Sequence, residues 1–162
     1  MKLQGSNFKK YHRALQLVYF ALLQGVLFFM FLIYFQTDDS FYDLNLSDSK
    51  ILTGIIVVLA ALFLSFYLYA YLLKNISAVK GIENKLEKYT SAFIVKMAIL
   101  EGGSFFNLVM YMISGNKAFL IFAAVLLLAM MMSFPGIDKI ENALDLSMGE
   151  RTYIDNPEKD FD

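Results

Sequence analysis

Four long apolar stretches separated by short polar segments dominate the hydrophobic pattern of the chain. They cover about residues 14–35, 52–73, 92–113 and 118–134. A helix needs roughly 20 apolar residues to cross the hydrocarbon core of a bilayer. The fourth stretch is the shortest, and Pro135 follows it directly, where a missing backbone donor stops or kinks a helix. The pattern therefore predicts four membrane-spanning helices.

Composition places these helices in a membrane rather than in a soluble core. Of the 162 residues, 58% are hydrophobic and only 18% are charged, and the mean hydropathy is +0.54. A soluble domain of this size is less apolar. The absence of cysteine excludes disulfides and cysteine metal sites, and a single histidine, His12, excludes a histidine metal cluster within one chain. We expect an all-α integral membrane four-helix bundle without a metal site or a cofactor.

The charges are segregated along the chain. The N-terminal tail and the segment after the second apolar stretch are basic, whereas the segment after the first stretch is acidic: Lys2, Lys9, Lys10 and Arg13; Lys74, Lys80, Lys85 and Lys88; Asp38, Asp39, Asp43 and Asp48. Basic residues accumulate on the cytoplasmic side of membrane proteins. We therefore predict a multi-pass protein with both termini in the cytoplasm. The first span lacks a cleavage pattern and is expected to stay as an anchor.

Two pairs of similar segments indicate an internal duplication. Residues 21–29 (ALLQGVLFF) resemble residues 98–106 (AILEGGSFF), at an offset of 77 (98 minus 21). Residues 82–87 (IENKLE) resemble residues 140–145 (IENALD), at an offset of 58 (140 minus 82). The order of the two landmarks is the same in both halves. Both copies would then enter the membrane from the cytoplasm.

The duplication divides the chain into two tandem helical hairpins. The first would cover residues 1–90 and the second residues 91–146, followed by an acidic flexible tail at residues 147–162. Each hairpin would end in a short cytoplasmic amphipathic helix, because apolar residues recur there at helical spacing. These helices would meet a partner, pack on each other or lie at the headgroups. We expect the first and third spans to be central, with the second and fourth flanking them.

Glu101 is the most informative polar residue, since it lies in the middle of the third span. A carboxylate at that depth costs at least about 2.5 to 3.5 kcal/mol, so it should be protonated, hydrogen-bonded, paired or open to a water-filled cavity. Gln24 stands at the equivalent depth in the first span, and its amide both donates and accepts hydrogen bonds. We predict a Gln24–Glu101 contact across these two spans. Ser104, three residues on, is a second candidate partner.

Small residues near these polar groups are expected to allow helices to approach closely. Gly25, Gly102 and Gly103 would serve the interface of the first and third spans, and Ala61 and Ser65 give the second span a small-xxx-small spacing. Lys96 precedes Glu101 by five residues, which corresponds to a rotation of about 140°. An ion pair between the two is therefore not favoured. We expect Lys96 to extend toward the headgroups.

The residues around Glu101 carry a resemblance to a known family. Residues 98–109 (AILEGGSFFNLV) are similar to the carboxyl-bearing helix of the rotor-ring proteolipids of rotary ATPases. This resemblance implies that Glu101 is an ion-binding carboxylate. The chain as a whole resembles small, uncharacterised four-span membrane proteins of bacteria. That resemblance implies a location in the bacterial cytoplasmic membrane and no particular activity.

Two functional classes fit these observations. The first is a structural or accessory membrane protein whose hairpins are joined by Gln24 and Glu101 and whose cytoplasmic helices meet a partner. The alternative is a proton- or cation-coupled membrane protein, either a transporter or a rotor-like protein, that uses Glu101 as the ion-binding carboxylate. The sequence contains no phosphate-binding glycine loop, no pairing of nucleophile and base, and no basic aromatic stripe. We therefore expect no enzyme and no nucleic-acid partner; the expected partners are the bilayer and a second copy or another membrane subunit.

Overall fold

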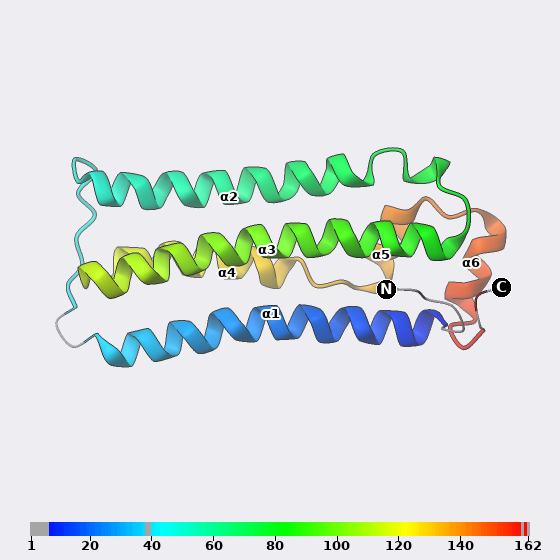
Figure 1. Cartoon of the computed structure of the whole chain (residues 1–162), viewed down its shortest axis with the longest axis horizontal. Helices are drawn as coiled ribbons and strands as arrows, with labels where there is room; N and C mark the ends of the chain where they lie inside the picture. Colours follow the sequence, from blue (N-terminus) through cyan, green and yellow to red (C-terminus); the bar gives the residue numbers. More distant parts are fainter. Residues whose placement is uncertain (1–6, 38–39, 160, 162) are drawn as a thin grey trace.

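The computed structural model describes residues 7–37, 40–159 and 161, and regular structure within them is helical. Lys2, Asp38 and Asp39 of the charge pattern lie outside the described residues. Figure 1 shows the helices in chain order: α1 (Phe8–Gln36), α2 (Ser49–Leu73), the 3-10 turn η1 (Ile76–Ala78), α3 (Ile82–Ser114), α4 (Ala118–Met132), α5 (Ile137–Leu144) and α6 (Met148–Asp155). The all-α prediction is confirmed.

Three helices are long and apolar enough to cross a membrane: α1, α2 together with η1, and α3. A fourth span is added if α4 and α5, which are bent by 76° at the break between them, count as one. With 15 residues and a rise of 1.5 Å per residue, α4 alone is about 22 Å long, less than the roughly 30 Å of a hydrocarbon core. The lengths and compositions of these helices indicate a membrane protein.

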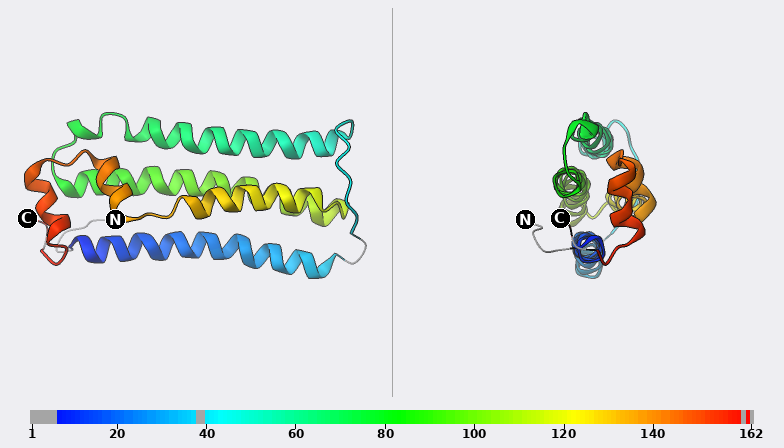
Figure 2. Two further views of the ribbon diagram at one scale, coloured as in Figure 1. Left: turned by 180° about the vertical axis from the view of Figure 1, so that it is seen from behind. Right: turned by 90° about the vertical axis from the view of Figure 1, so that its right-hand side faces the viewer.

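The central element of the bundle is α3. It contacts α1, α2, α4 and α5, and its buried side chains continue through almost its whole length. Figures 1 and 2 show α1 and α2 on opposite sides of α3. The expectation that the first span is also central is wrong. Most of the circumference of α1 faces outward, because its buried residues form one narrow stripe: Phe8, Tyr11, Leu15, Tyr19, Val26 and Ile33.

The two halves of the chain do not form equivalent hairpins. α3 and α4 are neighbours joined by a tight turn, whereas α1 and α2 are separated by α3. The cytoplasmic amphipathic helix that was expected at the end of the first hairpin is instead the start of α3. Asn75, with φ 60°, and Gly81, with φ 84°, occupy the left-handed half of backbone space and reverse the chain there. The amphipathic helix expected after the fourth span is present as α5.

One end of the bundle holds the acidic loop and the α3–α4 turn, and we call it the loop end. Phe41 and Asn116 form a bridge in which the Phe41 N–H donates to Gly115 O at 3.0 Å and the Lys117 N–H donates to Phe41 O at 2.8 Å. The Asn116 side chain is buried. It donates to Asp43 O at 2.8 Å and accepts from the backbone of Ala118 at 3.0 Å. The loop is thereby attached to the turn.

The opposite end, which we call the terminal end, holds the start of α1, the start of α3, and α5 and α6 (Figure 1). The tail that was expected to be flexible contains α6, which begins with a capping box between Ser147 and Glu150. Lys85 of α3 is buried and pairs with Glu150 at 2.8 Å. The tail then returns to α1, where the Lys9 N–H donates to Pro157 O at 2.9 Å. Both described ends of the chain therefore lie at the same end of the bundle.

Candidate functional site

Glu101 lies where α1 crosses α3. A Cβ atom added to Gly25 would stand 3.6 Å from Glu101 Oε1, so the carboxyl group lies against the α1 backbone at the one position without a side chain. The Glu101 side chain is half-buried. Gly25 therefore lies at the interface of α1 and α3. Among the described residues, no hydrogen bond or ion pair to the Glu101 carboxyl is found.

Gln24 faces away from the bundle. Val26, two residues on, is completely buried, and two positions correspond to a rotation of about 200° along a helix. Gln24 is exposed among large apolar side chains that are also exposed, including Phe28 at 63% and Phe31 at 59%. Within the described part of the chain no hydrogen bond joins Gln24 to Glu101. The Gln24 and Glu101 side chains therefore point in different directions, and the predicted contact between them is not formed.

The small hydroxyl side chains of the spans bond to their own helices. Ser104 Oγ donates to Leu100 O at 2.8 Å and is buried, so it does not serve as the partner of Glu101. Ser65 Oγ likewise donates to Leu62 O at 2.9 Å. Such internal bonds satisfy hydroxyl groups where no water is available. These two residues therefore pack between helices without linking them.

Close helix packing is concentrated at α2 and α3. A Cβ on Gly103 would lie 2.9 Å from Ala61 Cβ and 2.9 Å from Leu126 Cδ1, which places α2, α3 and α4 in contact at one point. A Cβ on Gly102 would meet nothing within 4 Å. The two adjacent glycines, predicted to have the same role, thus have different ones. Gly103 and Ala61 are brought together, and Gly102 is exposed.

Lys96 does not extend toward the headgroups as expected. Its side chain is 9% exposed, and Nζ lies 4.4 Å from the centre of the Phe66 ring and 5.0 Å from that of Tyr69, both on α2. A cation over aromatic faces is stabilised by the negative ring face. The aromatic residues of α2 offer Lys96 an alternative to the headgroups. No ion pair joins Lys96 to Glu101 in the described residues, in agreement with their angular separation.

Polar contacts of α1 are concentrated at the terminal end. Tyr11 Oη lies 2.9 Å from Thr90 Oγ1 and donates to Leu86 O at 3.2 Å. His12 Nε2 lies 2.9 Å from Pro135 O, and because a carbonyl oxygen only accepts, Nε2 carries the hydrogen. Sequence reasoning missed these contacts. The available signal was the four-residue spacing of Tyr11, Leu15 and Tyr19, which places both tyrosines on one buried stripe of α1.

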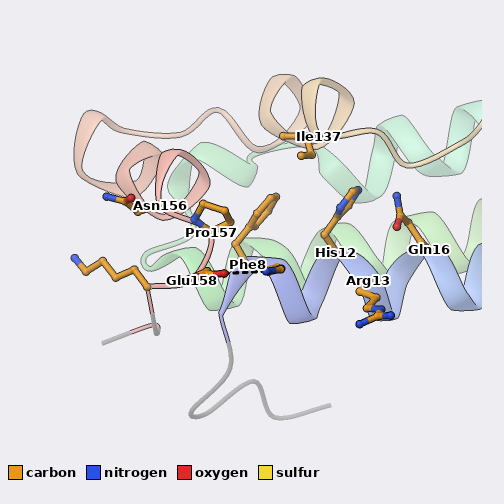
Figure 3. Close-up of a pocket in the computed structure, with 10 residues that line it drawn as sticks. Phe8, His12, Arg13, Gln16, Ile137, Asn156, Pro157 and Glu158 are labelled. Carbon is orange, nitrogen blue, oxygen red and sulfur yellow. Dashed lines mark hydrogen bonds and ion pairs between the residues drawn. The ribbon is translucent and has the colours of Figure 1, made fainter.

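A cavity of about 760 Å³ opens beside His12. Figure 3 shows Phe8, His12 and Gln16 pointing from α1 toward Ile137 of α5, with Asn156 and Pro157 of the tail closing one side. The rings of Phe8 and His12 are stacked, with centroids 6.0 Å apart and planes 2° apart. The cavity could not be foreseen from the sequence, since it depends on the tail returning to α1.

Comparison with known proteins gave no match: none was found among protein-family models, among curated proteins or among solved structures.

Proposed function

We propose that the chain is a multi-pass protein of the bacterial cytoplasmic membrane, with both termini cytoplasmic, and that it acts as a structural or accessory subunit rather than as an enzyme. The candidate spans support insertion. The basic residues Lys9, Lys10 and Arg13 at the terminal end support its cytoplasmic placement. Since both described ends of the chain lie at that end, a cytoplasmic location of one implies the same for the other.

The outward direction of the Gln24 side chain is the observation that supports a role as a subunit of a larger complex. In the proposed orientation this amide faces hydrocarbon from the middle of α1, where a polar group without a bonding partner is costly. Amides on transmembrane helices commonly bond to a neighbouring helix. We define the outer face of α1 as Leu17, Phe20, Gln24, Phe28 and Phe31, all exposed. We infer that a helix of another subunit covers this face and bonds to Gln24.

This proposal changes the role that the sequence suggested for Gln24. The amide was expected to join two hairpins within one chain through Glu101, but the two side chains do not meet. The contact is now placed between subunits, and the occupant is a second copy or another membrane protein. The duplication stays a proposal supported by the sequence match and by the presence of both matched landmarks, residues 82–87 and 140–145, at the terminal end (Figure 1).

The size of the assembled complex tests the proposal. We would extract the protein from native membranes with a mild detergent and measure the mass of the complex by light scattering. Replacement of Gln24 by Leu should reduce the mass toward that of a single chain, because a hydrogen bond of about 1 kcal/mol is lost at each contact. Gln24→Asn keeps the amide and should preserve part of the larger species. A wild-type protein that is already a single chain would contradict the proposal.

A second candidate function rests on Glu101. Its half-buried carboxyl has no bonding partner within the described residues, which leaves it available to a proton or a cation. Treatment of native membranes with a hydrophobic carbodiimide across a pH series, with Glu101→Gln as the control, tests whether Glu101 handles ions. Labelling of Glu101 that decreases as the pH rises would favour ion handling. Labelling only after unfolding would reject it.

A further inference from the structure

Two polar side chains in the middle of α1 and α3 lie at nearly the same depth without bonding to each other. A Cβ on Gly25 would stand 3.6 Å from Glu101 Oε1, so this carboxyl lies close to the depth of Gly25. Gln24 is the preceding residue, and one position along a helix corresponds to about 1.5 Å. Within the described residues, the side chain of neither Gln24 nor Glu101 takes part in a hydrogen bond. In the proposed orientation each group is costly until a partner bonds to it.

Gln24 lies on the flank of α1 that borders Glu101. Successive helical residues are about 100° apart, so Gly25 lies about 100° and Gln24 about 200° around α1 from the buried Val26, in the same rotational direction. Starting from the buried stripe, the contact between Gly25 and Glu101 comes first and Gln24 comes next. The opposite flank of α1 faces α4, where Leu27 lines an apolar groove of about 510 Å³ between the two helices. A helix that packs on the first flank would therefore border both Gln24 and the exposed side of Glu101.

The surface beside these two polar groups lets another helix approach closely. Ala21 precedes Gln24 by three positions, Ala98 precedes Glu101 by three, and both alanines are exposed. Gly102 is also exposed, and a Cβ on it would meet nothing within 4 Å. Small residues on membrane helices allow the backbone of a neighbouring helix to come near. The partner of the two polar groups can therefore be a helix that lies against α1 and α3 together.

A second copy of the chain supplies a partner for both groups at once. Two copies inserted in the same orientation are related by an axis along the membrane normal, and rotation about this axis keeps every residue at its depth. Gln24 of each copy then lies at the depth of Glu101 of the other. The two side chains are complementary, because an amide N–H donates and a carboxyl oxygen accepts. A helix of a different protein would match this depth and this chemistry only by coincidence of its own sequence.

We propose that two copies of the chain form a dimer in which Gln24 of each copy donates a hydrogen bond to the Glu101 carboxyl of the other. α1 of one copy lies against α1 and α3 of its partner, beside Gly25 and Gly102. The two contacts are equivalent, as a two-fold symmetric interface requires. The inference rests on the proposed assembly through Gln24, and it adds the identity of the partner and of the group to which Gln24 bonds.

Complementation between two single variants tests this arrangement. Gln24→Leu and Glu101→Leu chains with different affinity tags are produced together, extracted from the membranes with a mild detergent and recovered through one tag. A uniform dimer of either variant has lost both contacts, whereas the mixed dimer retains one of them. With about fivefold for each contact, the uniform dimers should be weakened about 25-fold and the mixed dimer about fivefold. The mixed dimer should therefore be recovered well above the proportion expected for random pairing.

Glu101→Gln is the matched control, because an amide at this position still accepts a hydrogen bond from Gln24, and it should assemble as well as wild type. The exchanged variant, Gln24→Glu with Glu101→Gln, tests the same contact without an apolar residue at position 101. It keeps one amide and one carboxyl at each contact and should also assemble as wild type does.

The possible failures separate this inference from the proposed function. Wild-type assembly by Glu101→Leu, or loss of assembly by the exchanged variant, would overturn the contact between Gln24 and Glu101. A loss in Gln24→Leu that Glu101→Leu does not restore would overturn the second copy as the partner and leave assembly through Gln24 in place. A wild-type protein that has the mass of a single chain would instead contradict the proposed function itself.

Discussion

Gly103 is a residue at which three helices pack closely. A methyl group there would lie 2.9 Å from both Ala61 Cβ on α2 and Leu126 Cδ1 on α4. The first of these atoms belongs to a side chain that cannot rotate away. We expect Gly103→Ala to separate α2 from α3 and to lower the free energy of unfolding by about 1 to 3 kcal/mol. The measurement is the thermal unfolding midpoint in lipid nanodiscs.

The neighbouring glycine supplies the control for that substitution. A methyl group on Gly102 would meet nothing within 4 Å, so Gly102→Ala should leave the unfolding midpoint unchanged or raise it slightly, since Ala favours a helix over Gly by up to about 1 kcal/mol. If both variants lose the same stability, the packing assigned to Gly103 is incorrect.

Two buried polar atoms of α3 lack partners within the described residues, Asn107 Oδ1 and Tyr111 Oη. Removal of the phenolic oxygen in Tyr111→Phe also removes an unsatisfied group from the interior. We expect the unfolding midpoint to stay the same or to rise, by up to about 1 kcal/mol in stability. The same nanodisc assay applies. A clear loss would show that the hydroxyl is bonded, for example to a buried water between these two residues.

At the scale of elements, a buried ion pair attaches α6 to α3. Lys85 is buried, and its Nζ donates to Glu150 Oε2 at 2.8 Å and to Asp145 O at 3.1 Å. Glu150→Gln would leave this cation without a charged partner, at a cost of about 1 to 3 kcal/mol. We expect faster amide hydrogen exchange across residues 148–155. The exposed pair of Lys9 and Glu158 is the comparison: Glu158→Gln should leave exchange in α6 unchanged.

The same ion pair gives α6 a pH dependence. Burial opposes ionisation of Glu150, but hydrogen bonds from Lys85 and Ser147 outweigh it and hold the pKa of this carboxyl below its ordinary value of 4.5. A carboxyl group whose pKa is lower in the folded state stabilises that state at pH values above its ordinary pKa. This stabilisation is lost as the pH falls through the lowered pKa. The protection factor across residues 148–155, which is the intrinsic exchange rate at each pH divided by the observed rate, should therefore be constant from pH 7 to 5 and decrease below 4.5. A constant protection factor down to pH 3 would contradict the pairing.

The spans and α5 could be predicted from the sequence because length, hydropathy and Pro135 act locally. The packing around them could not. Equal depth of Gln24 and Glu101 says nothing of the direction in which each side chain points, and that direction depends on which stripe of α1 packs on α3. The tail appeared flexible from its polar composition, since the partner that holds Glu150 is Lys85, far away along the chain. Gly102 and Gly103 are adjacent in the sequence and differ only in the side of α3 that each occupies.

At the scale of the whole molecule, α1 is the most weakly attached span. In the most apolar 18-residue segment of α1, 17% is buried, against 44% in the corresponding segment of α3. The polar contacts of α1 to the bundle are near the terminal end, at Tyr11, His12 and Tyr19. Much of its apolar surface, together with Gln24, is left to lipid or to another subunit. We therefore expect assembly at α1 rather than at α2.

Photo-cross-linking in native membranes tests this central claim most directly. The chain contains no cysteine, so Phe28→Cys carries a single benzophenone label on the outer face of α1. Phe63→Cys carries the same label on α2, where the side chain is equally exposed to the outside, 67% against 63% for Phe28. We predict a discrete protein adduct from position 28 that Gln24→Leu removes, and none from position 63. Adducts to lipid alone from position 28, or the same protein adduct from both positions, would contradict it.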